Sequence, residues 1–399
     1  MRKIDQIFDA YSENNIFKNK KVLQVNYKPE NIPHRDKQIE ELASILAPVL
    51  RGERSSNLFV YGQTGTGKTL STHYVKKEIE KRAEKNGLPL RIEYLNCKLR
   101  KVADTEYRIL AELIRKLGGS VPSTGLPTDK VYSKFIDKVE KEEKQIILIL
   151  DEIDQAVKKI SDGFLYNLTR LNSELEKTQL SLIGISNELN FLDNLDPRVR
   201  SSLSEEELVF PPYNAIQLQD ILKKRAKEGF KGDVLEEGVI SKCAAYAARE
   251  HGDARRALDL LRIAAELAER EGNDRVELEH VDHSNNKIDR DKVLEVVKTS
   301  PKQFRLTLLS IIRLTEKSDE KIFTGDVYNF YTTLAKKAND NALTQRRISD
   351  IIAEIDMLGL INARVISKGR HGRTRKIKLS IPEKVLGKVK KILKKSLDL

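Results

Sequence analysis

The segment from Gly62 to Thr69 has the pattern GxxxxGK[ST], which is typical of a loop that binds phosphate groups. Its glycines allow backbone N–H groups to face phosphate oxygens where a helix begins. Lys68 is expected to reach the β- and γ-phosphates, and Thr69 to place its hydroxyl on Mg²⁺. The apolar run 57–61 precedes the segment and a helical stretch follows it, which is the context such a loop requires. The residues expected to bind a nucleotide here are Gly62, Gln63, Thr64, Gly65, Thr66, Gly67, Lys68 and Thr69.

Acidic residues follow the apolar run 146–150, which has the unbroken hydrophobicity of a strand buried on both faces of a parallel sheet. Asp151 and Glu152 would then stand at the carboxyl end of that sheet, where ligands bind. Asp151 suits the Mg²⁺ shell together with Thr69, and Glu152 can polarise an attacking water as general base. The alternative is that both acids only cap the next helix. We expect Asp154 to be structural or solvent-facing.

Asn187 follows the apolar run 180–185, which is expected to lie beside the strand 146–150. Its amide could orient the attacking water, or it could be an ordinary turn asparagine. Short apolar strands alternate with helices in this part of the chain, which predicts a doubly wound α/β sheet. The expected strands are 57–61, 90–96, 146–150, 180–185 and 207–210.

The strand signal stops after Pro211 and Pro212, and two further domains are expected beyond them. A small helical domain is predicted from helices at 214–229, 234–250, 253–271 and 277–284. The polar stretch 283–291 is the candidate linker. Three helices and two amphipathic strands then have the pattern of a winged helix, with elements expected at 302–315, 325–338, 344–357, 360–366 and 374–380.

The net charge of +12 is concentrated at one end of the chain. Between Arg364 and Leu399 there are thirteen basic and two acidic residues. A basic region of this kind indicates a polyanionic partner, most often nucleic acid. The stretch 384–395 alone could instead be a solvated lysine tail.

The overall composition excludes several classes of protein. The 399 residues are 39% hydrophobic and 33% charged, which argues against wholesale disorder and against collagen-like repeats. No window approaches 18 consecutive apolar residues, so no membrane span is expected. The first residues lack an apolar signal core, which favours a cytoplasmic location. Two cysteines without a CxxC pair predict neither a disulfide framework nor a zinc ribbon.

Taken in order, these motifs resemble those of the AAA+ ATPases, and more narrowly those of the archaeal origin-recognition (Orc/Cdc-type) initiators. The resemblance covers nearly the whole chain, from about residue 15 to 380. The segments that carry it are 63–69, 150–154, 185–187, 195–203, 210–213 and 252–258, followed by the helix-rich basic C-terminus. The combination of Gly-Asp-Ala-Arg-Arg-Ala-Leu at 252–258 with a C-terminal winged helix is the more specific part.

The resemblance implies an α/β P-loop AAA+ domain with a parallel sheet over 1–212, an all-α lid over 213–290 and a winged-helix domain over 291–399. It makes Asn187 and Arg255 the two residues that sense the nucleotide, with Arg255 reaching from the lid to the γ-phosphate. Arg256 would point elsewhere and could be a surface residue.

Two further lid residues, Tyr213 and Arg225, fall where relatives line the nucleotide cleft. A tyrosine ring can stack on adenine and a guanidinium can bind ribose or phosphate; Arg225 could also be an ordinary exposed helix residue. The segment 33–35 corresponds to one that closes over the base, without an assigned role for its side chains.

The function implied is an ATP-dependent initiator that binds double-stranded DNA at replication origins and recruits or loads the replicative, minichromosome maintenance-type helicase. ATP or ADP with Mg²⁺ would be its cofactor, slow ATP hydrolysis would act as a switch, and other copies of the initiator on DNA would be partners. The alternatives are a clamp-loader-like or STAND-type signalling NTPase, and a winged-helix transcriptional regulator. Many AAA+ proteins have a trans-acting Ser-Arg finger after the fourth strand. The corresponding segment of this chain is out of register with that pattern, which leaves Arg198 or Arg200 as candidates for the finger.

Two groups of residues are expected to contact DNA in the winged helix. The N-terminus of the helix 344–357 presents Arg346 and Arg347, which could read bases in the major groove. The wing between the last two strands is suited to the minor groove and to phosphates, and its candidates are Lys368, Arg370, His371, Arg373 and Arg375. The long interval 97–145 holds, by the resemblance, a further helix that touches DNA.

Overall fold

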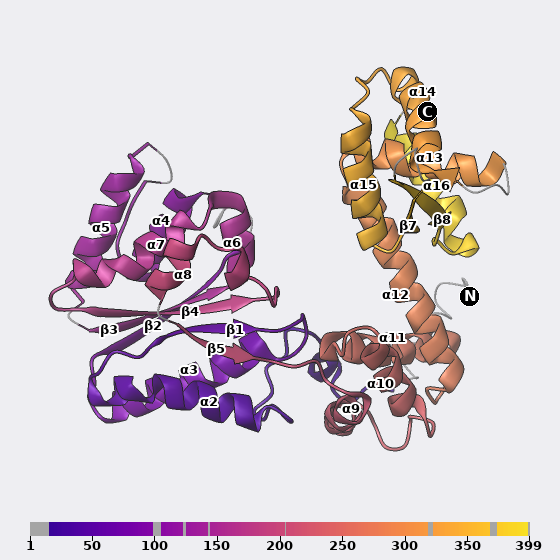
Figure 1. Cartoon of the computed structure of the whole chain (residues 1–399). Helices are drawn as coiled ribbons and strands as arrows, with labels where there is room; N and C mark the ends of the chain where they lie inside the picture. The colour runs from indigo at the N-terminus through magenta and orange to yellow at the C-terminus, as the bar shows by residue number, and fades with distance from the viewer. Residues whose placement is uncertain are drawn as a thin grey trace. The chain divides into compact units, whose positions relative to one another are not determined.

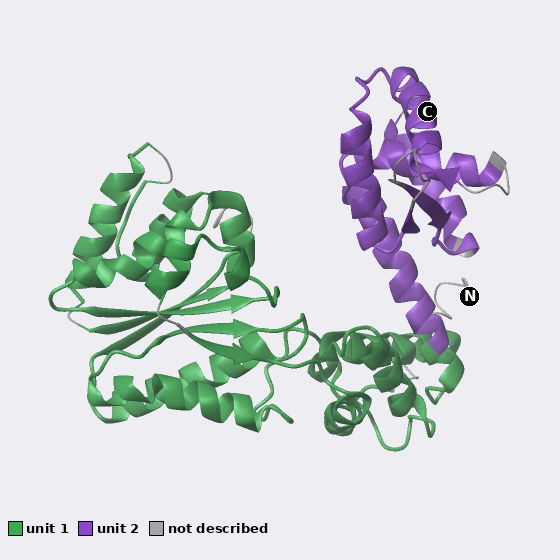
Figure 2. Cartoon of the chain, in the orientation of Figure 1, with its two compact units in different colours: residues 1–281 green, residues 282–399 purple. Residues whose placement is uncertain are grey.

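The computed structural model describes residues 16–98, 105–122, 125–142, 144–203, 205–317, 322–367 and 373–397. The chain divides into two compact units, residues 1–281 and residues 282–399 (Figure 2). Among the described residues, no helix combines the length and the apolar character needed to cross a bilayer.

The first unit is built on a parallel sheet of five strands in the order β2-β3-β4-β1-β5. The predicted α/β sheet is thereby confirmed, and the strand that carries Asp151 lies next to the strand that precedes Asn187. Their neighbouring carboxyl ends bring the two side chains to one edge of the sheet. The strands are β1 (Asn57–Tyr61), β2 (Leu90–Asn96), β3 (Gln145–Asp151), β4 (Gln179–Ser186) and β5 (Glu205–Val209).

Helices cover both faces of this sheet (Figure 1). One face is covered by α2 (Asp36–Leu46), the 3₁₀ turn η2 (Ala47–Arg51) and α3 (Lys68–Lys85). The other is covered by α4 (Glu106–Lys116), α5 (Thr128–Glu140), α6 (Ile153–Ile160), α7 (Gly163–Arg170) and α8 (Pro197–Leu203). Short 3₁₀ turns are also found at η1 (Lys20–Leu23), η3 (Leu171–Ser173) and η4 (Leu192–Asn194).

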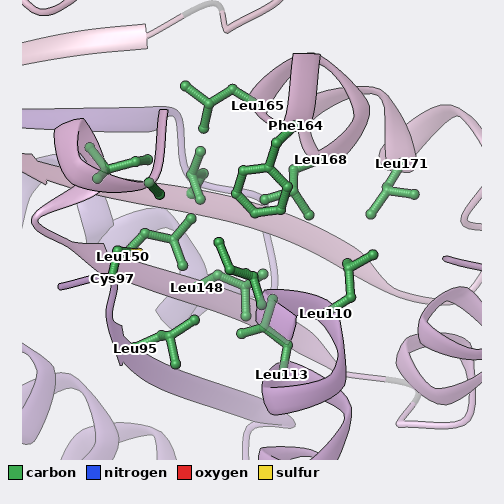
Figure 3. Close-up of a cluster of buried hydrophobic side chains, with 14 of the residues drawn as sticks. Leu95, Cys97, Leu110, Leu113, Leu148, Leu150, Phe164, Leu165, Leu168 and Leu171 are labelled. Carbon is green, nitrogen blue, oxygen red and sulfur yellow. The ribbon is translucent and has the colours of Figure 1, made fainter. Parts of the chain in front are cut away.

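The sheet separates two hydrophobic cores. On the side of α4 and α7, Leu148 and Leu150 of β3 pack against Leu110, Leu113 and Phe164 (Figure 3). A second cluster fills the space between the strands and the helices α2 and α3. Strand β3 is buried on both faces because it lies between these two cores, which is why its sequence is a continuous apolar run rather than an alternating one.

The helical lid follows β5 in the same unit. It consists of α9 (Ala215–Gly229), α10 (Val239–Arg249), α11 (Ala254–Glu271) and the start of α12 (Leu278–Thr299). Residues near the start of the described chain pack onto it: the rings of Phe17 and Phe230 stack with centroids 5.3 Å apart, and the N–H of Ile16 donates to Glu269 at 3.1 Å.

The division between the two units, at 281/282, falls beside the predicted linker at 283–291, but that stretch is not an irregular segment, because α12 runs through it without a break. The stretch is polar but contains neither glycine nor proline, so nothing in its backbone chemistry ends a helix. Ser284 is buried, and Asn285 donates a hydrogen bond to Asp289 one turn later at 3.1 Å. The division between the two units therefore falls inside a helix.

The second unit has the helices and strands of a winged helix, as predicted. Strands β6 (Ile322–Phe323), β8 (Arg373–Leu379) and β7 (Ile361–Ser367) form a small antiparallel sheet in that order. Its helices are α13 (Lys302–Lys317), α14 (Thr324–Lys337), α15 (Gln345–Met357) and α16 (Glu383–Leu397).

The basic C-terminal stretch belongs to this fold. Helix α16 buries Val385, Val389 and Leu393 in the core of the second unit and leaves Lys388 and Lys391 exposed. The stretch is therefore an amphipathic helix with a lysine-rich outer face rather than a free tail, because its apolar residues recur at helical spacing.

Candidate nucleotide site

The glycine-rich loop connects the carboxyl end of β1 to the start of α3. Gly67, with φ of +92°, occupies the left-handed region as the residue before α3, a conformation that favours glycine. Lys68 opens the helix and is buried. Its ammonium donates to the carbonyls of Gly62 at 2.6 Å and Gln63 at 2.8 Å, and to Oδ1 of Asn187 at 2.9 Å. Burial lowers the pKa of Lys68 from 10.5 to about 8, although nearby Asp151 acts in the opposite direction.

Asp151 is held by three hydrogen bonds at the end of β3, where it is 4% exposed. The hydroxyl of Thr69 donates to Oδ2 at 2.9 Å, and the hydroxyl of Tyr94 donates to the same oxygen at 2.7 Å. The N–H of Glu152 donates to Oδ1 at 2.9 Å. The two residues expected to hold Mg²⁺, Thr69 and Asp151, are thus in direct contact.

Tyr94 was not among the predicted site residues. It lies on β2, next to β3, and its ring packs on His73 of α3 with centroids 4.4 Å apart. Burial, with the neighbouring carboxylate of Asp151, raises the pKa of Tyr94 above its ordinary value, so its hydroxyl remains a donor. Only the pairing of β2 with β3 brings this tyrosine to the site, and no local motif marks it.

The polar residues around Asp151 have distinct partners. Glu152 adopts a left-handed backbone conformation with φ of +53°, and its carboxylate lies 3.2 Å from the ammonium of Lys98. Asp154 is buried and structural: its carboxylate accepts hydrogen bonds from the N–H of Asn187 at 3.3 Å and from Gln155 at 2.7 Å. Asn187 is therefore fixed between Asp154 and the ammonium of the loop lysine.

A cavity of about 1070 Å³ lies between the loop, the strand ends and the lid. Arg255, at the start of α11, is exposed and lines it, and its N–H is bonded to the capping carboxylate of Asp253 at 2.8 Å. Arg256 is not the surface residue that was suggested. Its side chain is only 11% exposed and pairs with Glu250 at 2.8 Å, because the turn of the helix directs it toward the lid.

Arg225 also lines the cavity, from α9. Its guanidinium lies over the ring of Tyr27 at 4.5 Å, and Nη1 is buried without a hydrogen-bond partner among the described residues. A buried charged donor without a hydrogen bond is unfavourable, and Arg225 lines the cavity in which a polar ligand would sit. The reading of Arg225 as an ordinary exposed helix residue is therefore wrong.

Tyr213 lines the cavity but is 4% exposed, and one face of its ring is already covered. The guanidinium of Arg35 lies 3.8 Å from the ring centroid. Arg35, in the segment for which no side-chain role was assigned, is itself buried beneath the loop.

Arg198 and Arg200, the candidate fingers, are exposed on α8 and pair with nearby aspartates.

The first DNA candidates lie at the start of α15 as predicted. Ile348, Ile351 and Ile352 face the core, and Arg346 and Arg347 are exposed at the helix N-terminus. Of the remaining candidates, Lys368, Arg370 and His371 lie outside the described residues, as do residues 99–104 of the long interval 97–145, and Arg373 begins β8.

Arg375 is directed inward, contrary to its expected place among the DNA contacts of the wing. Its Nη1 donates to the backbone carbonyl of Ser349 at 2.6 Å, and the side chain is half-buried. It therefore ties the hairpin to α15. The sequence pattern could not distinguish this arginine from its neighbours.

Comparison with protein families matches three segments of the chain. An AAA ATPase domain matches residues 31–183, a Cdc6 AAA+ ATPase-type lid domain matches 219–286, and a CDC6 C-terminal winged helix domain matches 295–389.

Whole-chain comparisons give close relatives. The "ORC1-type DNA replication protein" of Thermococcus onnurineus is 52% identical over 388 residues, which is 96% of this chain and 93% of that protein. That of Pyrococcus furiosus is 52% identical over 384 residues, covering 95% and 91% of the two chains. The solved Aeropyrum pernix ORC1 protein in complex with DNA is 44% identical and superposes with a TM-score of 0.84 over 95% of this chain and 97% of that one.

Proposed function

Because the chain belongs to the family of ORC1-type DNA replication proteins, we propose that it is a replication initiator that binds double-stranded origin DNA under the control of a bound adenine nucleotide. The observation that carries this proposal is the joint presence of a phosphate-binding loop beneath a lid and a winged helix with an exposed arginine pair at the start of α15. A similar A. pernix protein has been solved with DNA.

The nucleotide site is proposed from the chemistry of its donors. Backbone N–H groups of the loop 62–69 and the ammonium of Lys68 suit the phosphates of ATP or ADP. The unsatisfied guanidinium nitrogen of Arg225 and the cavity beside Tyr213 leave room and a charged donor for the rest of the nucleotide.

Mg²⁺ fits the oxygen donors Thr69 and Asp151, which already touch. Mg²⁺ is commonly held by one or two carboxylates together with phosphates and water, so this pair of donors is of the expected kind. When bound, the ion would neutralise charge on the phosphates.

Hydrolysis would be slow and would serve as a switch. Glu152 is the proposed general base and Asn187 the residue that orients the water. The carboxylate of Glu152 lies 3.2 Å from the ammonium of Lys98. Arg255 would reach from the lid toward the γ-phosphate and couple its presence to the lid.

DNA recognition would be divided between two parts of the winged helix. Arg346 and Arg347, at the start of α15, would read base edges, and the basic wing would contact the minor groove and phosphates. The initiator would then recruit or load a minichromosome maintenance-type helicase, with further copies of the chain on the same DNA. A clamp-loader-like or STAND-type NTPase would not need this exposed arginine pair, and a transcriptional regulator would not need the nucleotide site.

The proposal is tested by mapping where the full-length protein binds on its own genomic DNA, with ATP or with ADP. We expect a few strong sites at replication origins whose occupancy differs between the two nucleotides. Scattered promoter sites with no dependence on nucleotide would favour the transcriptional regulator. A Lys68→Ala variant provides the matched control, because it should retain the winged helix and lose the nucleotide dependence.

A further inference from the structure

Arg35 is a buried cation at the junction of three parts of the first unit. It precedes α2 and is 2% exposed, among the largest fully buried side chains of the described chain. Its Nε donates to the backbone carbonyl of Thr66, in the phosphate-binding loop, at 2.8 Å. Its Nη2 donates to the carbonyl of Pro211 at 2.5 Å, in the connection between β5 and α9. One guanidinium therefore joins the loop to the start of the lid.

The same side chain contacts the first residue of the predicted lid. The guanidinium lies 3.8 Å from the ring centroid of Tyr213, a distance at which a cation is attracted to the ring face. A Cβ added to Gly67 would lie 3.0 Å from the Tyr213 hydroxyl and 3.8 Å from Nε of Arg35. The loop therefore rests directly on this pair, and Gly67 admits the close approach because it has no side chain.

The charge of Arg35 has no anionic partner among the described residues. Its hydrogen-bond acceptors are the carbonyls of His34, Thr66 and Pro211, all neutral. Burying a guanidinium without a carboxylate is unfavourable, and carbonyl dipoles offset only part of that. An anion on the other side of the loop would complete the compensation. The loop is the proposed site of the phosphates, so the position of this cation suits a bound polyphosphate.

We propose that Arg35 is a positioning residue that supports the phosphate-binding loop and transmits its state to the lid through the connection at Pro211 and Tyr213. A shift of the Thr66 carbonyl on binding or loss of the γ-phosphate would move the guanidinium. The guanidinium would in turn move the connection, because the same planar group holds both carbonyls. Arg35 need not touch the nucleotide. The inference rests on the proposed function, since it requires that the loop binds a nucleotide.

The test uses the full-length chain with a pair of dyes that report the position of the lid. Cysteines introduced as Lys81→Cys on α3 and Lys223→Cys on α9 lie at exposed positions outside the site. The native Cys97 and Cys243 are buried, and burial raises the pKa of each thiol to about 12, so neither competes for the dyes. Energy transfer is measured with ADP and with a non-hydrolysable ATP analogue, and nucleotide affinity is measured in parallel.

Arg35→Gln removes the positive charge and the simultaneous hydrogen bonds to the carbonyls of Thr66 and Pro211. We expect ATP affinity to fall about ten- to a hundredfold, the loss that accompanies removal of hydrogen bonds to a charged group. We also expect the difference in energy transfer between the two nucleotides to disappear. Arg51→Gln makes the same change of net charge at a residue whose side chain is 72% exposed, and it should behave as the parent protein does.

Arg35→Lys separates charge from bridging. A lysine retains the positive charge but has no fork to hold two carbonyls at once, so affinity should recover in part while the energy-transfer difference stays lost. If either folded variant keeps the full difference, the inference is overturned. If Arg35→Gln fails to fold, the lysine variant decides in the same way. If the parent protein binds neither nucleotide, the proposed function fails. That outcome differs from one in which the parent and the variant both show a difference in energy transfer between the two nucleotides, which overturns only the role of Arg35.

Discussion

The hydroxyl of Tyr94 offers a sharp test of how Asp151 is held. It donates to Oδ2 of Asp151 at 2.7 Å, and the hydroxyl of Thr69 donates to the same oxygen. Tyr94→Phe removes one oxygen atom and keeps the ring that packs on His73. Because a hydrogen bond to a charged group contributes about 1.5–3 kcal/mol, the free energy of unfolding should fall by an amount in this range.

The same substitution should alter the response to Mg²⁺. Without the Tyr94 hydroxyl, Oδ2 of Asp151 keeps only one of its two hydrogen bonds. The carboxylate is then less well ordered before Mg²⁺ binds, and ordering it reduces the free energy of Mg²⁺ binding. A loss of about 1.5–3 kcal/mol corresponds to a ten- to hundredfold change in an equilibrium constant. We expect the Mg²⁺ concentration for half-maximal ATP hydrolysis to rise toward that limit, while affinity for Mg²⁺-free ADP changes little.

Tyr132→Phe is the matched control. Its hydroxyl also donates to a carboxylate, that of Glu106, between α4 and α5 and away from the loop. This control should lose a similar free energy of unfolding and keep the parent's Mg²⁺ requirement. Equal Mg²⁺ requirements for the two variants would refute the reasoning. Because the pKa of Tyr94 is raised, its hydroxyl in the folded protein stays protonated up to and beyond the ordinary value of 10. The difference in free energy of unfolding between the parent and Tyr94→Phe should therefore stay constant across neutral pH and be lost only in strong alkali.

Three other perturbations test separate parts of the proposed function. Lys68 has its pKa lowered to about 8, so raising the pH through that value removes the charge that faces the phosphates. Affinity for ATP, measured by titration calorimetry, should therefore fall above about pH 8, and unchanged affinity at about pH 10 would contradict this. Glu152→Gln should bind ATP normally and hydrolyse it at least about a hundredfold more slowly, as a phosphate-release assay would show; a parental rate would exclude Glu152 as the general base. Replacing Arg346 and Arg347 together by alanine should reduce the preference for origin over random duplex, measured by fluorescence anisotropy, by about 1–3 kcal/mol for each bidentate arginine–base pairing that the substitutions remove. Undiminished preference would place base recognition elsewhere in the chain.

Much of the nucleotide site could be predicted from the sequence because its pattern is local. The loop 62–69 needs glycines at particular backbone positions, and Gly67 indeed takes the left-handed conformation that opens α3. The apolar run that ends at Asp151 predicted a buried parallel strand, because a strand covered on both faces cannot alternate. The same reasoning placed Asn187 at the end of a neighbouring strand, and the pairing of β3 with β4 confirms that the two strands are adjacent.

The polar stretch at 283–291 lies beside the division between the two units, as its composition suggested, but it is helical rather than irregular. A helix is set by its backbone and by the contacts at its two ends. The start of α12 packs in the lid and its end in the core of the second unit, where Val297 is buried. A polar segment with no helix breaker between two such anchors stays helical.

The partners of single side chains depended on the tertiary structure alone. Arg35 meets the loop and the lid connection across 31 and 176 residues of chain. Arg375 is directed toward α15, although it lies in the same basic segment as the other candidate DNA contacts of the wing. Strands, helices and the phosphate-binding loop could be assigned from the sequence, because hydrophobic periodicity and glycine conformation act over a few residues. Only folding decided which polar groups meet, since contacts between distant segments follow from strand order and helix packing rather than from any local pattern.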